Sequence, residues 1–595
     1  MFRDDAMANF ERWLHTQQQR GDGQLLWPKV ELRRPVDDES MGYGLFARED
    51  IRLNEIAIKV PERTMLTAGM VADIPEYAYI MERVQLDPAE VLALFFCFER
   101  VHFDCFCEQS ADGVPFLVQW EMDIPPGFAR FIQMRKSRRP HQKSADDDDE
   151  FWWRPYLGIL PLRFGTPLFR HFLRGDDFCR LRRVADKLPQ EAKSKLLGQL
   201  AELRVLEKKL FTLLYPFSNC VQKANGRRSL EGETFDASNF DKLPRESIEF
   251  WREMCCWAWH VVNTRCIFVH NLPFHRLVDS PRGNCCAEVD DGHPPRHNAG
   301  GGGGLKRRKG RRMRRPLDGG RTENISESPH STSDYGNDDG RGEEEEDYGG
   351  SLAIVPLVDM LNHSTDAQCV AMFDHKHSRH YLIRADQHFV PAGNQLFVCY
   401  GAHDNARLWV EYGFRMNAWN PFNRVAMPQD LFIALAERCG VRVSDRRREV
   451  LGKANLCCTI YATDDEPSFA LRKSCTILLL EREKLQNWSQ HIFGDYFGEG
   501  QPPPPPSPRG EMKLLGSILG LLQKALEGRK ANCCVAGGDE DDDGEEEEET
   551  ALLCSLWDDQ IDIVRRMAAH LAEEDKKTID QNAEMDEDTG GRLLI

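Results

Sequence analysis

This 595-residue chain contains a long internal segment, residues 279–350, that has almost no aliphatic side chains. It holds a glycine run at 300–304, a basic run at 306–315 and an acidic run at 343–347. Such a composition buries too little apolar surface to offset the entropy of ordering, so we predict that the segment is disordered. A fold of this chain must therefore assemble core-forming segments from both sides of the insertion.

The chain is acidic overall, with a formal net charge of −19, but much of this charge lies in short runs. Twenty acidic residues occupy the runs 146–150, 343–347, 539–543 and 545–549, and eight basic residues occupy 306–315. Runs of like charge repel and stay solvated, so the net charge says little about a partner. The 41% of hydrophobic residues suffice for a core, and this length predicts two or more domains.

The 19 cysteines do not follow a metal-binding pattern. Four cysteine pairs are adjacent in sequence and no CxxC motif occurs, so we expect no metal site. The N-terminal residues form no apolar signal region, so a reducing, intracellular compartment is expected. No apolar run approaches the roughly 20 residues that span a bilayer, so we expect no membrane association.

Apolar patterns predict an interrupted α+β part that begins near residue 25 and is followed by an all-α part. Short apolar stretches bounded by Gly, Asn or Pro indicate strands, and longer stretches with an apolar face indicate helices. Residues 103–150 are expected to form an irregular insertion. The predicted strands are 45–51, 56–61, 352–358, 369–373, 381–384 and 395–400, and the predicted helices are 89–101, 166–214, 246–268, 405–412, 431–438, 512–526 and 551–573.

Three short motifs combine residue types that can bind a polar ligand. Met41-Gly42-Tyr43-Gly44 precedes a predicted strand, and its glycines allow either a close backbone approach to a ligand or a plain tight turn. It lacks the third glycine and the helix of a dinucleotide-binding motif. Asn362-His363-Ser364 follows an apolar strand and could contact a ligand or close an Asx turn. Tyr400 ends a strand and could direct its hydroxyl into a cleft or pack in the core.

In their order along the chain, the three motifs resemble those of SET-domain protein methyltransferases, in the branch typified by the plant Rubisco large-subunit methyltransferase. The resemblance extends to Phe151–Pro161 and Trp257–Arg265. It implies an α+β SET-domain fold of short strands with a pseudoknot, interrupted by a helical insertion and disordered loops and followed by an all-α C-terminal domain. The implied boundaries are a catalytic domain at 25–415 (parts 25–65, 66–278, 279–350 and 351–415) and a helical substrate-binding domain at 425–590, with disordered inserts near 500–510 and 535–550.

The resemblance also implies roles for individual residues. The implied cofactor is S-adenosylmethionine, and Tyr400 matches the active-site tyrosine of the family. Asp359 and Ile267 fall in the region that faces the substrate side chain. The residues that match cofactor-binding positions are Met41, Gly42, Tyr43, Arg265, Asn362, His363, Tyr412, Gly413 and Phe414.

The implied activity is methylation of a lysine side chain in a protein, histone or non-histone. A histidine methyltransferase of the same branch has an asparagine two residues past the arginine that matches Arg265, where this chain has the apolar Ile267, which favours lysine. Protein histidine methylation and a non-catalytic SET-fold binding module remain alternatives. The basic run 306–315 lacks interleaved aromatic residues, so we do not expect direct nucleic-acid binding. It is either a nuclear localisation signal or a solvated loop, and the expected localisation is the nucleus, the cytoplasm or both.

Overall fold

The computed structural model describes most of the chain outside the long insertion and several shorter segments. All described residues belong to the unit made of Met1–Val278 and Tyr348–Ile595. The disorder predicted for 279–350 falls outside the described residues except at Gly350, where a strand begins. The described residues are 2–19, 27–34, 42–106, 124–137, 153–172, 178–215, 243–270, 350–374, 378–386, 388–416, 419–456, 458–494, 508–534 and 545–590.

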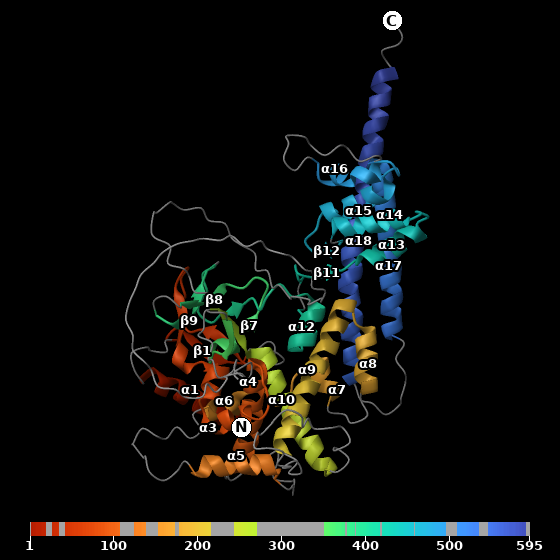
Figure 1. Ribbon diagram of the computed structural model, residues 1–595. Helices are drawn as coiled ribbons and strands as arrows, with labels where there is room; N and C mark the ends of the chain where they lie inside the picture. Colours follow the sequence, from red (N-terminus) through yellow and green to blue (C-terminus); the bar gives the residue numbers. More distant parts are fainter. Residues whose placement is uncertain are drawn as a thin grey trace, which may run out of the picture. The chain divides into compact units, whose positions relative to one another are not determined.

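Short strands from both sides of the insertion pair with one another (Figure 1). The central strand β9 pairs with β3 and β8, and the central strand β6 pairs with β4 and β5, all antiparallel. β1 pairs antiparallel with β2, and β7 pairs parallel with β10. The strands are β1 Val30–Arg33, β2 Gly44–Ala47, β3 Ile56–Pro61, β4 Leu66–Thr67, β5 Ile267–His270, β6 Gly350–Ile354, β7 Asn362–His363, β8 Cys369–Asp374, β9 His380–Ala385 and β10 Phe397–Val398.

Helices cover these sheets and supply most of the first hydrophobic core. The helices α4 and α10 pack against each other through phenylalanine and tryptophan side chains, including Phe98 and Trp251 with ring centroids 6.1 Å apart. The helices of this part are α1 Phe2–Gln19, α2 Ala68–Ala72, α3 Pro75–Met81, α4 Pro88–Phe106, α5 Pro126–Ser137, α6 Arg154–Ile159, α7 Pro167–Phe172, α8 Phe178–Lys187, α9 Gln190–Leu214, α10 Arg245–Arg265 and α12 Asn405–Tyr412, with 3-10 turns at Glu62–Thr64 and Val358–Met360.

The helices α1 and α5 are among those that lie where the sequence patterns predicted none. The helix α1 precedes residue 25, and its Phe10, Trp13 and Leu14 are buried against α6. The helix α5 lies inside the segment 103–150 that we expected to be irregular, and its Phe128 and Phe131 pack on Phe98 at ring distances of 5.3 and 5.2 Å. Both helices are stabilised by burial against distant segments, which a local pattern does not reveal.

Several predicted elements end earlier in the structure than in the sequence pattern. The helix predicted at 246–268 ends at Arg265, because Ile267 to His270 form β5 and pair with β6. The segment 66–278 is therefore not wholly helical, since it begins with β4 and ends near β5. The strand predicted at 352–358 ends at Ile354, and Leu357 then adopts φ 74° and ψ −44° and turns the chain into a 3-10 helix. The strand predicted at 45–51 forms β2 only as far as Ala47.

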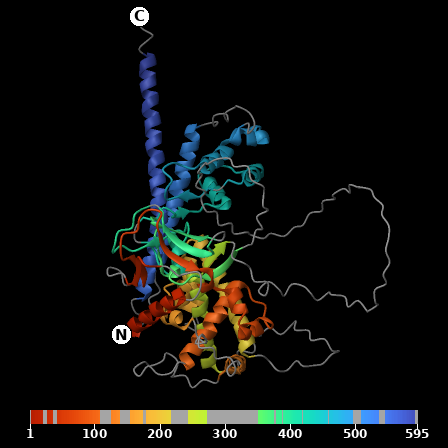
Figure 2. The same cartoon turned by 90° about the vertical axis from the view of Figure 1, so that its left-hand side faces the viewer.

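The C-terminal part forms a second hydrophobic core, built mainly from helices. It is not purely α-helical, because the short strands β11 and β12 pair antiparallel. The long helix α17 packs along α18 (Figure 1 and Figure 2). The elements are α13 Gln429–Arg438, α14 Asp445–Ala454, α15 Phe469–Leu479, a 3-10 turn at Lys484–Asn487, α16 Trp488–Phe493, α17 Pro508–Cys534, α18 Glu545–Gly590, β11 Arg424–Val425 and β12 Ile460–Tyr461.

The helix α18 begins inside the segment 535–550 that we expected to be disordered. Residues 545–550 are helical, whereas 535–544 and the insert near 500–507 lie outside the described residues. Acidic side chains in the first turn of a helix are stabilised by its macrodipole. Glu549 is also buried and lies 3.0 Å from Nε2 of His171 in α7. These two effects explain why part of an acidic run is ordered.

Candidate active site

The parallel pairing of β7 with β10 places the Asn-His motif beside the strand that leads to Tyr400. Asn362 lies opposite Phe397 and His363 lies opposite Val398. The backbone N–H of Tyr400 donates a hydrogen bond of 3.1 Å to Nδ1 of His363. Two motifs that are separated by 37 residues in sequence therefore form one local structure.

The glycine motif before β2 approaches the same strand pair. The side-chain amide of Asn362 donates to the carbonyl of Tyr43 at 3.4 Å. A Cβ atom at Gly44 would lie 2.2 Å from Nε2 of Gln395 and 3.1 Å from Nδ2 of Asn362, so a side chain there would displace the Gln395 amide and press on that of Asn362. Gly42 has a φ of 72° and open space beside it. Met41 lies outside the described residues.

Tyr400 is held by its hydroxyl group as well as by its backbone. The hydroxyl donates a hydrogen bond of 2.7 Å to the carbonyl of Leu361. Burial raises the pKa of Tyr400 to about 12, although the positive charge of Arg265 opposes this shift. The hydroxyl therefore stays protonated near pH 7 and acts as a hydrogen-bond donor there, not as a base.

His363 is a neutral imidazole at neutral pH. Burial lowers its pKa more than the nearby Val398 carbonyl raises it. Because Nδ1 accepts the amide of Tyr400, the ring proton of the neutral form is on Nε2. Nε2 is buried and has no hydrogen-bond partner among the described residues. This ring nitrogen is therefore a donor that a bound molecule could use.

The segment Tyr412-Gly413-Phe414 completes a group of rings around His363. The ring of Phe414 lies 6.1 Å from that of His363, and the ring of Tyr412 lies 5.0 Å from that of Tyr400. Burial raises the pKa of Tyr412, which keeps this phenol protonated as well. The group combines aromatic faces with a few polar atoms, as small-molecule sites do.

A buried polar triad of Tyr156, Arg265 and Asp359 lies close enough to Tyr400 to shift its pKa. Nη1 of Arg265 donates to the Asp359 carbonyl and to its carboxylate Oδ2, both at 3.2 Å. The Tyr156 hydroxyl donates to the same Oδ2 at 2.6 Å. The Asp359 side chain has no exposed surface, and burial raises its pKa against the opposing effect of Arg265. The second carboxylate oxygen, Oδ1, is buried without a hydrogen-bond partner among the described residues.

Tyr156 was absent from the predicted site residues, although it lies in a motif that we used to recognise the family resemblance. Its contact with Asp359 spans 203 residues, so no local pattern could reveal it. The structure brings together Asn362, His363, Tyr400, Tyr412 and Phe414 directly. Ile267 is partly buried in β5 opposite Ala353, two residues past Arg265. The roles predicted for these residues stay predictions.

Comparison with known proteins identifies the family. The SET domain family matches residues 42–401, which include Gly42 to Gly44 of the glycine motif, the Asn-His motif and Tyr400. The chain belongs to the SET domain family. This match confirms the resemblance that we inferred from the motifs. The predicted SET fold with a helical C-terminal region is confirmed as well.

Several SET-domain proteins are similar to this chain over different lengths. SET domain-containing protein 4 of Mus musculus is 22% identical over 465 residues, which cover 78% of this chain and 72% of that protein. Ribosomal lysine N-methyltransferase set11 of Schizosaccharomyces pombe is 32% identical over 82 residues, 14% of this chain and 20% of that protein. A crystal structure of the SET domain of LSMT bound to lysine and AdoHcy aligns with a TM-score of 0.44 and 12% identity, covering 96% of this chain and 92% of that chain.

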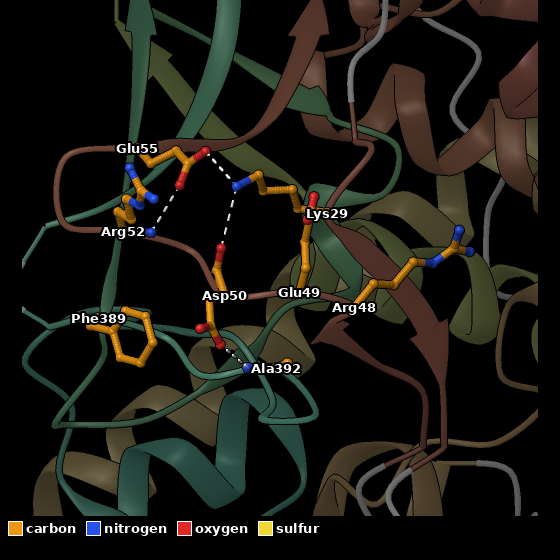
Figure 3. A pocket seen from close by; sticks show the side chains of 8 residues that line it. All are labelled: Lys29, Arg48, Glu49, Asp50, Arg52, Glu55, Phe389 and Ala392. Carbon is orange, nitrogen blue, oxygen red and sulfur yellow. Dashed lines mark hydrogen bonds and ion pairs between the residues drawn. The ribbon is translucent and has the colours of Figure 1, made fainter.

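A separate pocket lies at the other end of β2 in this SET domain and contains none of the predicted site residues (Figure 3). Nζ of Lys29 lies 2.7 Å from Oε1 of Glu55, and Asp50 accepts the backbone N–H of Ala392 at 3.0 Å. The residues that line this pocket are distinct from the group of rings around His363.

In the helical part, one group of described side chains could hold a metal ion. The ligand atoms of Glu466, His570 and Glu574 lie within 4.8 Å of one another. Arg472 forms ion pairs with both carboxylates, at 3.4 and 3.8 Å, and so already balances their charge. Within the described residues, no helix has both the length and the apolar character that a membrane span requires.

Proposed function

We propose that this SET-domain protein transfers a methyl group from S-adenosylmethionine to a lysine side chain of a protein substrate. Family membership supports a methyltransferase, and the similarity to a fission-yeast ribosomal lysine N-methyltransferase supports lysine. The observation that carries the proposal is the position of Tyr400. Its hydroxyl is fixed on the Leu361 carbonyl and its ring lies between those of His363 and Tyr412.

The residues around His363 fit a molecule with an amino-acid end and a flat base. Nε2 of His363 and Nε2 of Gln395 are buried polar atoms that have no hydrogen-bond partner among the described residues. The space beside Gly42 is open, and the rings of Tyr412 and Phe414 offer aromatic faces. When bound, S-adenosylmethionine supplies a methyl group carried by a positively charged sulfur. Gly42, Tyr43, Asn362 and His363 would hold it, together with Phe414.

Methyl transfer to lysine requires the neutral amine. An ordinary lysine has a pKa near 10.4, so its deprotonation at pH 7 costs about 4–5 kcal/mol. Burial of the ammonium in an apolar channel beside a positive charge lowers this cost. The protonated Tyr400 cannot remove the proton at neutral pH. We infer that the Tyr400 hydroxyl and the Leu361 carbonyl orient the reacting groups, so that alignment supplies much of the acceleration.

One feature favours lysine over histidine as the acceptor. Ile267 places an apolar side chain where a histidine methyltransferase of this branch has an amide, and an apolar wall suits the methylene chain of lysine. Arg265 balances the charge of Asp359, so this buried carboxylate stabilises the cationic form of either acceptor less than an unpaired one would. The helical part would then bind the protein that carries the lysine.

The test is transfer of a labelled methyl group into a proteome extract, followed by identification of the modified residue. Tyr400→Phe removes the hydroxyl and keeps the ring, so we expect turnover to fall by about 100-fold. S-adenosylmethionine binding, measured by calorimetry, should change little. Labelled histidine would replace the lysine proposal, and wild-type protein without cofactor binding would favour the non-catalytic binding module. Turnover of Tyr400→Phe at the wild-type rate would remove the role of the hydroxyl.

We also propose that the protein acts in the nucleus as well as the cytoplasm, on a histone or another protein. The basic run 306–315 supports nuclear import. Imaging a variant that lacks residues 306–315 tests this proposal, because loss of the nuclear fraction is expected. An unchanged distribution would reject it.

A further inference from the structure

One carboxylate of the helical part contacts both ends of the segment that carries the active-site rings. Asp559, in α18, accepts a hydrogen bond of 2.7 Å at Oδ2 from Nδ2 of Asn405. Its Oδ1 lies 2.8 Å from Nη2 of Arg415. Asn405 is the first residue of α12 and Arg415 directly follows Phe414. Asp559 therefore joins the start of α12 to the residue after Phe414, across 154 residues of sequence at the first contact and 144 at the second.

The Asn405 end of this bridge belongs to a buried asparagine network. The side-chain carbonyl of Asn405 accepts from Nδ2 of Asn420 at 3.1 Å, and its backbone N–H donates to Oδ1 of Asn423 at 2.9 Å. Asn420 has no exposed surface and also donates to the carbonyl of His403 at 3.0 Å. Because Asn405 is itself buried, its amide depends on these partners and not on water. The network fixes the loop between Tyr400 and α12.

The Arg415 end is a partly shielded ion pair. The side chains of Arg415 and Asp559 are 24% and 19% exposed, so solvent screens the pair less than an ion pair on the surface. Arg415 follows Phe414, whose ring packs at 6.1 Å from that of His363. Displacement of Arg415 would therefore move a ring of the candidate cofactor site.

The helix that carries Asp559 is anchored in both hydrophobic cores. Leu553 and Leu556 are buried in the core of the catalytic part, whereas Ile561 is buried in the core of the helical part. Between them, Nε1 of Trp557 donates to the carbonyl of Lys187 at the end of α8, at 2.8 Å. Packing holds the residues of α18 on both sides of Asp559. A movement of this helix would therefore displace Asp559 as well.

We propose that Asp559 is a positioning residue that couples the helical part to the cofactor site. It acts through Asn405 and Arg415, and it holds the segment 400–415 in the conformation that gathers Tyr400, Tyr412 and Phe414 around His363. This inference rests on the proposed function only for the identity of the cofactor. The coupling itself depends only on contacts between residues of this chain, whichever cofactor binds.

The main test compares Asp559→Ala with Asp562→Ala in the full chain. Asp562 is a matched control, because it lies one turn further along α18, is 63% exposed and pairs only with Arg565 among the described contacts. We expect Asp559→Ala to weaken S-adenosylmethionine binding about tenfold, or about 1.4 kcal/mol, in calorimetry. Amide hydrogen exchange of residues 400–415 should also accelerate in the cofactor-free protein, with α13 and α15 unchanged. Asp562→Ala should alter neither quantity.

A second variant separates positioning from a general loss of stability. Arg415→Gln removes the charge at the other end of the bridge, so it should reproduce part of both effects if Asp559→Ala fails to fold. The double variant should bind S-adenosylmethionine about as tightly as Asp559→Ala alone, because both changes break the same contact. Asp559→Asn, which keeps an acceptor for Asn405, should have an intermediate effect.

The outcomes distinguish this inference from the proposed function. Wild-type protein that does not bind S-adenosylmethionine would overturn the proposed function, while the exchange of residues 400–415 would still test the bridge. Asp559→Ala and Arg415→Gln with wild-type cofactor affinity and wild-type local exchange would overturn the bridge. A lower melting temperature with no local change at 400–415 would also overturn it, since it would show only a structural contribution.

Discussion

At the scale of single residues, Gly413 shows how a turn position can also be a packing requirement. It ends α12 with a φ of 85°, in the left-handed region that glycine adopts without steric cost. A Cβ atom at this position would lie 2.7 Å from the carbonyl carbon of Gly165 and from the amide nitrogen of Thr166. The backbone of the ring-bearing segment therefore touches the loop before α7, and this contact places Phe414 near His363.

Gly413→Ala should consequently cost more stability than the backbone conformation alone explains. Gly440 is the matched control, because its φ is 86° and a Cβ atom there meets no atom within 4 Å. We expect Gly440→Ala to lower the free energy of unfolding by about 1–2 kcal/mol, the cost of a side chain in the left-handed region. Gly413→Ala should lower it further and weaken cofactor binding. Denaturant unfolding and calorimetry measure both, and equal losses at the two positions would contradict the steric argument.

At the scale of elements, α10 joins the helical insertion to the catalytic strands and carries a buried histidine. Nδ1 of His260 lies 2.7 Å from the carbonyl of Cys256, one turn earlier, and Nε2 lies 2.8 Å from Oγ1 of Thr166. Nδ1 therefore carries the proton and Nε2 accepts from the threonine hydroxyl. Burial lowers the pKa of His260 to about 4, more than the Cys256 carbonyl raises it. The helix is built around a neutral ring.

The low pKa of His260 predicts that acid destabilises the fold through α10. Between the unfolded pKa near 6.5 and the folded pKa, the unfolded chain binds a proton that the folded chain does not. Stability is therefore full above pH 6.5 and falls as the pH drops, by about 1.4 kcal/mol per pH unit for one such group. Unfolding measured between pH 4.5 and 6.5 should show a shallower slope for His260→Gln than for wild type. The exposed His388→Gln serves as the control, and an unchanged slope for His260→Gln would exclude this cause.

At the scale of the whole chain, α18 links the two hydrophobic cores. Its first turns bury Leu553 and Leu556 with the catalytic part, and Glu549 pairs with His171 of α7. Its later turns bury Val564 and Leu571 with the helical part. The catalytic part is therefore not complete without a helix from the far end of the sequence.

Leu556→Ala should for this reason destabilise the catalytic part although the residue lies outside the SET match. We expect a loss of about 2–5 kcal/mol, as for other buried leucines. Amide exchange should accelerate in α7 and α8, whose residues contact the same turns of α18. Leu571→Ala, in the second core, should instead affect α13 to α15 and α17. The same exchange pattern for both variants would contradict the division of α18 between two cores.

The amino-acid sequence alone was sufficient to predict the family and several residues that the structure gathers around His363. Gly44, Asn362, His363 and Tyr400 belong to short motifs whose order along the chain indicated the SET family, and the apolar patterns predicted α4, α12 and the strands β3, β6, β8 and β9 of the two three-stranded sheets. These predictions succeeded because turn chemistry and periodic burial are local properties of a sequence.

The contacts between groups that are distant in sequence became known from the fold. The pairing of β5 with β6 ends α10 three residues before the helical pattern does, since strand hydrogen bonds with the far side of the insertion replace helical ones. Burial against α6 orders α1, and contacts across 203 and 154 residues bring Tyr156 to Asp359 and Asp559 to Asn405. Such contacts depend on how the whole chain packs, and no local pattern in the sequence encodes them.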